Sequence, residues 1–68
     1  MSAGAIIREL RLEKGVSQEA AASEVGVTKS SWAMYERGER IPRDEVKVKI
    51  AGYFGRSVQD IFFSYIEH

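Results

Sequence analysis

The chain has 68 residues, the size of one small domain, and its ten basic and ten acidic side chains give a formal net charge of zero. A neutral total disfavours loose, charge-driven binding to nucleic acid, and the absence of cysteine excludes disulfides and thiolate metal sites. No apolar run is long enough to cross a membrane, and no basic segment precedes a long apolar one at the start. We therefore expect a single cytoplasmic domain over residues 1–68.

The apolar spacing along the chain predicts helices only, which makes the expected fold all-α. Glycine follows each of the first four helical patterns by one position, where it can adopt the left-handed conformation that ends a helix. Helix starts are marked by the capping residues Ser17, Thr28 and Ser57, and by Pro42 ahead of two acids. The five expected helices cover residues 3–14, 17–25, 28–37, 44–54 and 57–64.

Segment 17–37, SQEAAASEVGVTKSSWAMYER, has the spacing of two short helices joined by a tight turn. Ala22 would lie where the two backbones come closest, and Gly26 falls in the turn, where a positive φ angle is needed. Trp32 would fill the space between the helices. The pattern predicts a helix-turn-helix, whose second helix can enter a DNA major groove. An ordinary helical hairpin without a nucleic-acid role would show the same spacing.

Four separate segments, in this order, resemble the Cro/repressor-type helix-turn-helix family of phage and bacterial regulators, also called the xenobiotic-response-element family. The segments are IRELRLEKGVSQ (7–18), EVGVT (24–28), YERGERIP (35–42) and AGYFGRSVQDIFF (51–63). The resemblance implies a compact five-helix, lambda-repressor-like domain that binds operator DNA sequence-specifically, commonly as a dimer. It also implies a location in the cytoplasm of a bacterial cell or a phage-infected host.

Base contacts are expected from the outward face of the second motif helix, because its N-terminal end would enter the major groove. Lys29 can donate to guanine acceptors, and Ser30 can bond to either base type or to a phosphate. Thr28 and Met34 can offer apolar contact to a thymine methyl group. The resemblance implies the same base-reading positions, and a merely solvated helix face is the alternative.

Phosphate contacts are expected from residues that surround this helix. Gln18 lies in the first turn of the first motif helix, where free backbone N–H groups attract a phosphate, and a glutamine at this place contacts the DNA backbone in the family. Ser31 and the arginines that follow the second motif helix would set register rather than read sequence. These arginines are Arg37, Arg40 and Arg43. Glu39 departs from the basic residue often found in this loop, which weakens the expected grip.

Two further expectations concern how the motif is held. The resemblance implies a partly buried salt bridge between Arg11 and Glu36, linking the first and third helices, with two exposed charges as the alternative. The family usually has leucine at position 21 and a branched aliphatic residue at 32. Ala21 and Trp32 therefore indicate an exchange of volume, in which the large side chain fills what the small one leaves open.

The C-terminal segment FFSYIEH carries more apolar side chains than one small core can bury. Phe63, Tyr65 and Ile66 are surplus and predict contacts of a homodimer. A two-fold dimer would present two reading helices about 34 Å apart, which matches successive major grooves of a palindromic operator. A tail that folds back on its own domain is the alternative.

The chain shows no constellation suited to catalysis, because its only histidine is the terminal His68 and it has neither a phosphate loop nor a metal-ligand cluster. We therefore expect no enzyme, no cofactor, no metal and no small-molecule ligand. The predicted function is that of a small Cro-like repressor acting on double-stranded DNA. The alternative is a protein-interaction module, antitoxin-like or anti-repressor-like, which zero net charge and an exposed Met34 would favour.

Overall fold

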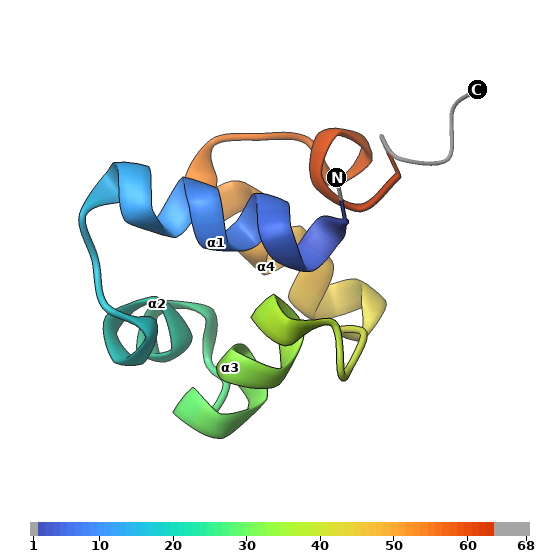
Figure 1. The fold of residues 1–68 in the computed structure, drawn as a ribbon. Helices are drawn as coiled ribbons and strands as arrows, with labels where there is room; N and C mark the ends of the chain where they lie inside the picture. The colour runs from blue at the N-terminus through green and yellow to red at the C-terminus, as the bar shows by residue number, and fades with distance from the viewer. Residues whose placement is uncertain (1, 64–68) are drawn as a thin grey trace.

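The computed structural model of the chain describes residues 2–63, and this range contains helices and turns but no strand. The elements are α1 (Ala3–Lys14), α2 (Gln18–Val25), α3 (Lys29–Arg37), α4 (Asp44–Phe54) and a terminal π-helical turn η1 (Gln59–Phe63). Figure 1 shows α2 and α3 beneath α1, α4 behind α1, and η1 beside the N-terminus. The predicted all-α, five-helix fold is confirmed. No helix within residues 2–63 has the length and apolar character needed to span a membrane.

Side-chain caps set where the helices begin. The Ser17 hydroxyl accepts the N–H of Ala20 at 3.0 Å, and the Thr28 hydroxyl accepts the N–H of Ser31 at 3.0 Å. Both hydroxyls satisfy a backbone donor that has no partner inside the helix. Because a cap precedes its helix, α2 and α3 each begin one residue later than the sequence predicted.

The last helix differs more from its prediction over residues 57–64. The Ser57 hydroxyl does accept the N–H of Asp60 at 3.0 Å, as a cap would. The backbone that follows forms a single π-helical turn from Gln59 to Phe63 instead of an α-helix. This wider turn carries two consecutive residues, Ile61 and Phe62, both buried in the core at 0% and 3% exposure. Residue 64 lies outside the described residues.

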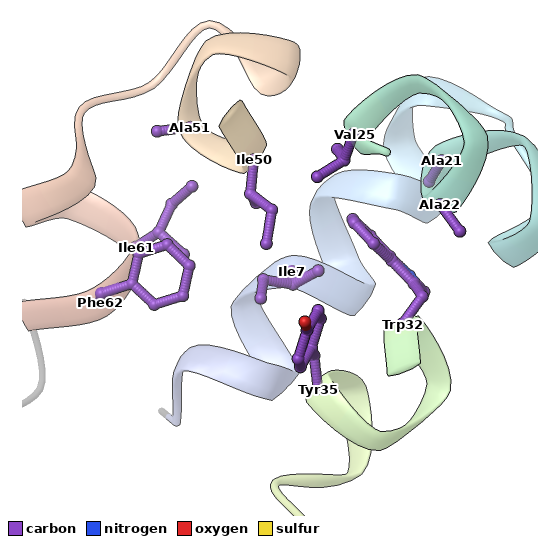
Figure 2. Packing of buried hydrophobic residues seen from close by; sticks show 10 residues of the cluster. All are labelled: Ile7, Ala21, Ala22, Val25, Trp32, Tyr35, Ile50, Ala51, Ile61 and Phe62. Carbon is purple, nitrogen blue, oxygen red and sulfur yellow. The ribbon is translucent and has the colours of Figure 1, made fainter. Parts of the chain in front are cut away.

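One hydrophobic core joins all five elements (Figure 2). Its members are Ile7, Ala21, Ala22, Val25, Trp32, Tyr35, Ile50, Ala51, Ile61 and Phe62. Trp32 is its largest fully buried side chain, and its ring centroid lies 6.2 Å from that of Phe54. Truncating such a buried aromatic residue costs about 3–5 kcal/mol. The helix α3 is therefore anchored through its own aromatic side chains, which leaves its opposite face free.

Ala21 and Trp32 are both completely buried, and Figure 2 shows them on the neighbouring helices α2 and α3. Their shared burial is what the expected exchange of volume requires. Whether the two volumes compensate each other stays a prediction.

Close packing between α1 and α3 depends on Gly4. A Cβ atom on this residue would lie 2.5 Å from the carbonyl oxygen of Tyr35 and 2.7 Å from that of Glu36. These contacts are too short for any residue with a side chain, and the atoms it would meet belong to backbone, which cannot move aside cheaply. Gly4 thus lets the first turn of α1 approach the last turn of α3.

Candidate nucleic-acid interface

The turn between α2 and α3 has the geometry of a helix-turn-helix, as the sequence predicted. Gly26 adopts a φ angle of 86°, and its N–H donates to the carbonyl of Ala22 at 2.8 Å. The N–H of Val27 donates to the same carbonyl at 3.0 Å. Ala22 itself is only 1% exposed, because it lies in the core between the two helices. These contacts end α2 abruptly and allow α3 to begin after only three linking residues, 26–28.

The first turn of α3 is open to solvent. Thr28, Lys29 and Ser30 are exposed, whereas Met34, one turn further on, is half-buried. Thr28 also caps the helix, so its methyl group is held at the very start of α3. Figure 1 shows α3 at the lower margin of the molecule, on the far side from η1. Three of the four residues expected to read bases are therefore accessible at the start of α3, and Met34 is only partly so.

A buried carboxylate braces this helix against the rest of the fold. The side chain of Glu36 is only 3% exposed and that of its partner Arg11 is 11% exposed. Arg11 donates through Nε to Oε2 at 2.6 Å and through Nη2 to Oε1 at 3.2 Å, while its Nη1 donates to the carbonyl of Val16 at 3.0 Å. Gln18 donates its amide to Oε1 at 3.0 Å, and the indole N–H of Trp32 donates to Oε2. The expected salt bridge thus forms part of a larger cluster.

The environment of Glu36 keeps its carboxylate ionised. Burial alone would raise its pKa, but the hydrogen bonds from Arg11, Gln18 and Trp32, with the charge of Arg11, lower the pKa below its ordinary value. Each oxygen receives two donors, so the buried charge is fully satisfied. The cluster joins α1, α2 and α3 through one side chain.

Sequence reasoning missed two members of this cluster. The spacing of Trp32 and Glu36, four residues apart on one helix, was the available signal for their hydrogen bond. Gln18 was expected to meet a phosphate, and its amide nitrogen instead already serves Glu36 with one hydrogen. The second hydrogen on that nitrogen keeps the capacity to donate outward.

The arginines expected to hold phosphates have different surroundings. Arg40 donates to the hydroxyl of Ser31 at 3.4 Å, which brings the loop after α3 to the first turn of that helix. Arg37 pairs with Glu39 through two hydrogen bonds of 3.0 Å each. Arg43 is exposed at the residue before α4 and makes no side-chain cap. Thr28, Ser31, Arg40 and Arg43 together line one open groove beside the reading end of α3.

An apolar surface near η1 adjoins this groove, and Ile41 lines both. Ile41 is 79% exposed and Phe63 is 37% exposed, and both line a hollow of about 300 Å³. Lys47 borders the same hollow, with its Nζ 5.4 Å from the ring centroid of Phe63. Of the residues expected to form dimer contacts, Phe63 is therefore accessible, whereas Tyr65 and Ile66 lie outside the described residues. Sequence reasoning did not include Ile41 in this surface.

Metal ligation has no evident site in this part of the chain. Among residues 2–63 no three histidine, cysteine, aspartate or glutamate side chains gather closely enough to hold a metal ion.

The sequence of this chain is similar to those of known regulatory proteins. The profile of a helix-turn-helix family matches residues 7–61. The cryptic phage CTXphi transcriptional repressor RstR of Vibrio cholerae is 34% identical over 55 residues, which cover 81% of this chain and 50% of the repressor. The chain thus spans half the length of that relative. The HTH-type transcriptional regulator YgzD of Bacillus subtilis is 35% identical over 57 residues, covering 84% of this chain and 86% of YgzD.

A solved structure shares the fold. The P22 c2 repressor protein, crystallised in complex with synthetic operator 9T, matches with a TM-score of 0.90 over 93% of this chain and 96% of its own. Its sequence is 24% identical, so this likeness speaks for the fold. The resemblance to Cro/repressor-type proteins is confirmed by the family match, and the family is not a class of enzymes. The chain belongs to the helix-turn-helix family of DNA-binding transcriptional regulators.

Proposed function

We propose that this chain represses transcription by binding a palindromic operator in double-stranded DNA as a homodimer. The observation that supports this most is the exposed first turn of α3, which projects from a helix that the Glu36 cluster holds rigidly. A reading element needs this combination, because base contacts require side chains held in fixed positions on an accessible helix end. A cytoplasmic location follows from the proposed partner, since bacterial and phage operators lie in that compartment.

In the proposed complex, the first turn of α3 enters the major groove. Lys29 donates to the O6 and N7 acceptors of a guanine, and Ser30 donates to a base edge or a phosphate beside it. Thr28 and Met34 contact thymine methyl groups, which suits the half-buried position of Met34 and the capped position of Thr28. A bidentate contact such as that proposed between Lys29 and guanine discriminates against the wrong base by about 1–3 kcal/mol.

Phosphate contacts fix the register of the helix in the groove. Gln18 gives one amide hydrogen to Glu36 and directs the other at a phosphate, so the brace that holds α3 also orients this contact. Ser31, Arg40 and Arg43 line the groove beside α3 and grip the next stretch of backbone. Arg37 is also expected to hold a phosphate, but its ion pair with Glu39 competes with that contact.

The dimer would form through the apolar surface near η1. Ile41 and Phe63 expose apolar area that a monomer of this size does not need, and the hollow beside them can receive a side chain from a second copy. The sequence predicts Tyr65 and Ile66 as further contacts of this dimer. The resulting two-fold axis would set the two α3 helices about 34 Å apart, one helical turn of DNA.

A second candidate function is a protein-interaction module of antitoxin or anti-repressor type. The exposed side chain of Ile41 and the net charge of zero favour it, because both suit an apolar protein partner better than a polyanion. In that case the surface near η1 would receive the partner protein, and α3 would not meet DNA.

Salt dependence separates the two candidates. An operator is first selected from random duplexes, and its affinity for the chain is then measured between about 50 and 200 mM salt. A DNA reader loses affinity steeply, with a slope of log affinity against log salt of about −0.9 for each phosphate that a cation neutralises. If the chain instead binds a protein through an apolar interface, its affinity for that protein should change little over the same salt range. Failure to enrich any duplex would contradict the proposed function.

A further inference from the structure

Glu39 lies in the loop after α3, between Arg37 and Arg40, and forms a forked ion pair with Arg37. The Nε and Nη2 groups of Arg37 each donate at 3.0 Å to a different oxygen of the Glu39 carboxylate. Two parallel N–H groups on one edge of a guanidinium are also what grips a phosphate bidentately. The carboxylate therefore occupies one of the positions that a DNA phosphate would need.

The backbone holds the two side chains together. Gly38 adopts a φ angle of 76°, and its N–H donates to the carbonyl of Tyr35 at 3.2 Å. The N–H of Glu39 donates to the carbonyl of Met34 at 2.9 Å. This helix cap fixes the turn between the paired residues, so they meet without any rearrangement of the loop. It also ties Glu39 directly to a residue of the proposed reading helix.

The pair is nevertheless open to exchange. The side chains of Arg37 and Glu39 are 56% and 54% exposed, so water and ions reach both. Ion pairs this exposed are weak, and another anion can replace one partner. The arrangement differs in this respect from the Arg11–Glu36 pair, whose side chains are buried.

We propose that Glu39 competes internally with DNA phosphate for Arg37 and thereby limits the affinity of this chain for every duplex. The inference rests on the proposed function. With Glu39 present, Arg37 adds no net charge to the phosphate-binding face, and its contact releases no counterions from DNA. Binding then depends more heavily on the base contacts of α3, on Gln18 and on the remaining arginines.

The test compares the full chain with Glu39→Gln, Arg37→Ala and the double variant, using fluorescence anisotropy with a selected operator and with a random duplex. Glu39→Gln should tighten binding to both duplexes by a factor of up to about five and steepen the salt slope by about 0.9. In the Arg37→Ala background the same substitution should leave the slope unchanged. Arg37→Ala alone should also leave the slope of the parent chain unchanged, because Arg37 paired with Glu39 releases no counterions from DNA.

Glu13→Gln serves as the matched control, since it removes the same negative charge from a position on α1 beside Phe54 and Arg56. It should change neither affinity nor slope. The inference is overturned if Glu39→Gln leaves both quantities unchanged while the parent chain binds its operator. It is also overturned if Arg37→Ala alone flattens the parent slope by about 0.9, because Arg37 would then already contact DNA. If neither the parent chain nor any variant binds a duplex, the proposed function itself fails.

Discussion

At the scale of single residues, Glu36 is the side chain on which the position of the reading helix depends most. Arg11 reaches it from α1, Gln18 from α2 and Trp32 from α3 itself. Its value lies in the donors that would lose their acceptor if it were removed, because buried donors without partners are costly. Arg11 would suffer most, since its guanidinium would remain charged in a site where only 11% of the side chain is exposed.

Glu36→Ala should therefore lower the free energy of unfolding by about 3 kcal/mol. Urea unfolding followed by the fluorescence of Trp32, the only tryptophan in the chain, measures this directly. Glu24→Ala is the matched control, because Glu24 is exposed on α2 and its removal should change stability by less than about 0.5 kcal/mol. Equal effects of the two substitutions would show that the cluster contributes nothing special.

The same residue predicts a pH dependence. The pKa of Glu36 is lowered in the folded chain from its ordinary value of 4.5, so the unfolded chain takes up a proton first as pH falls. The stabilising contribution is complete above pH 4.5 and is lost as pH falls through the folded pKa. Glu36→Gln removes this titration, so its unfolding free energy should depend less on pH below 4.5 than that of the parent chain. Parallel pH profiles for both proteins would contradict the assignment.

At the scale of elements, the close approach of α1 to α3 makes Gly4 irreplaceable. Gly4→Ala would force a methyl group against the carbonyl oxygens of Tyr35 and Glu36, and should cost about 1–3 kcal/mol. Gly52→Ala is the control, because a Cβ on Gly52 in α4 meets no atom within 4 Å. That substitution should raise stability by about 0.5–1 kcal/mol, as alanine does in a helix interior. Thermal melts with the same sign for both variants would contradict the proposed contact.

Some features of the helices could be predicted from the sequence, and others could not. The caps at Ser17 and Thr28 and the stop at Gly26 are local signals, so the helix-turn-helix could be predicted nearly to the residue. Gly4 carries no local signal, because its constraint comes from the backbone of a helix more than thirty residues away. The π-helical turn at η1 was also missed, because the cap that the sequence predicts at Ser57 does form and does not distinguish a π-helical turn from an α-helix.

For the site, the exposed start of α3 could be predicted from the sequence, whereas most of the side-chain hydrogen bonds around it could not. The Arg11–Glu36 pair followed from a resemblance, but the donation from Gln18 depends on how α2 meets α3 in space. The pairing of Arg37 with Glu39 depends likewise on the conformation of one capped turn. The first contact arises from tertiary geometry and the second from a local turn, and apolar spacing encodes neither.

At the scale of the whole molecule, the proposed homodimer depends on the surface that contains Ile41 and Phe63. Ile41→Ser should weaken self-association, because it removes the most exposed large apolar side chain described in the chain. Sedimentation equilibrium over a range of concentrations measures the change. Val48→Ser is the matched control, since Val48 is 62% exposed on α4 outside that surface and should leave the dimer intact. A parent chain that stays monomeric at every concentration would contradict the proposal.

Base reading by the first turn of α3 is tested by site selection from random duplexes, carried out with the parent chain and with Lys29→Ala. The parent chain should enrich a palindromic consensus. The variant should lose its preference for guanine at one symmetric pair of positions. Its binding free energy for the parent operator should weaken by about 1–3 kcal/mol for each lost contact. Lys49→Ala, which removes an exposed lysine from α4, should keep the parent consensus. If the consensus were unchanged after Lys29→Ala, or if the parent chain enriched no consensus, the first turn of α3 would not be the element that reads bases.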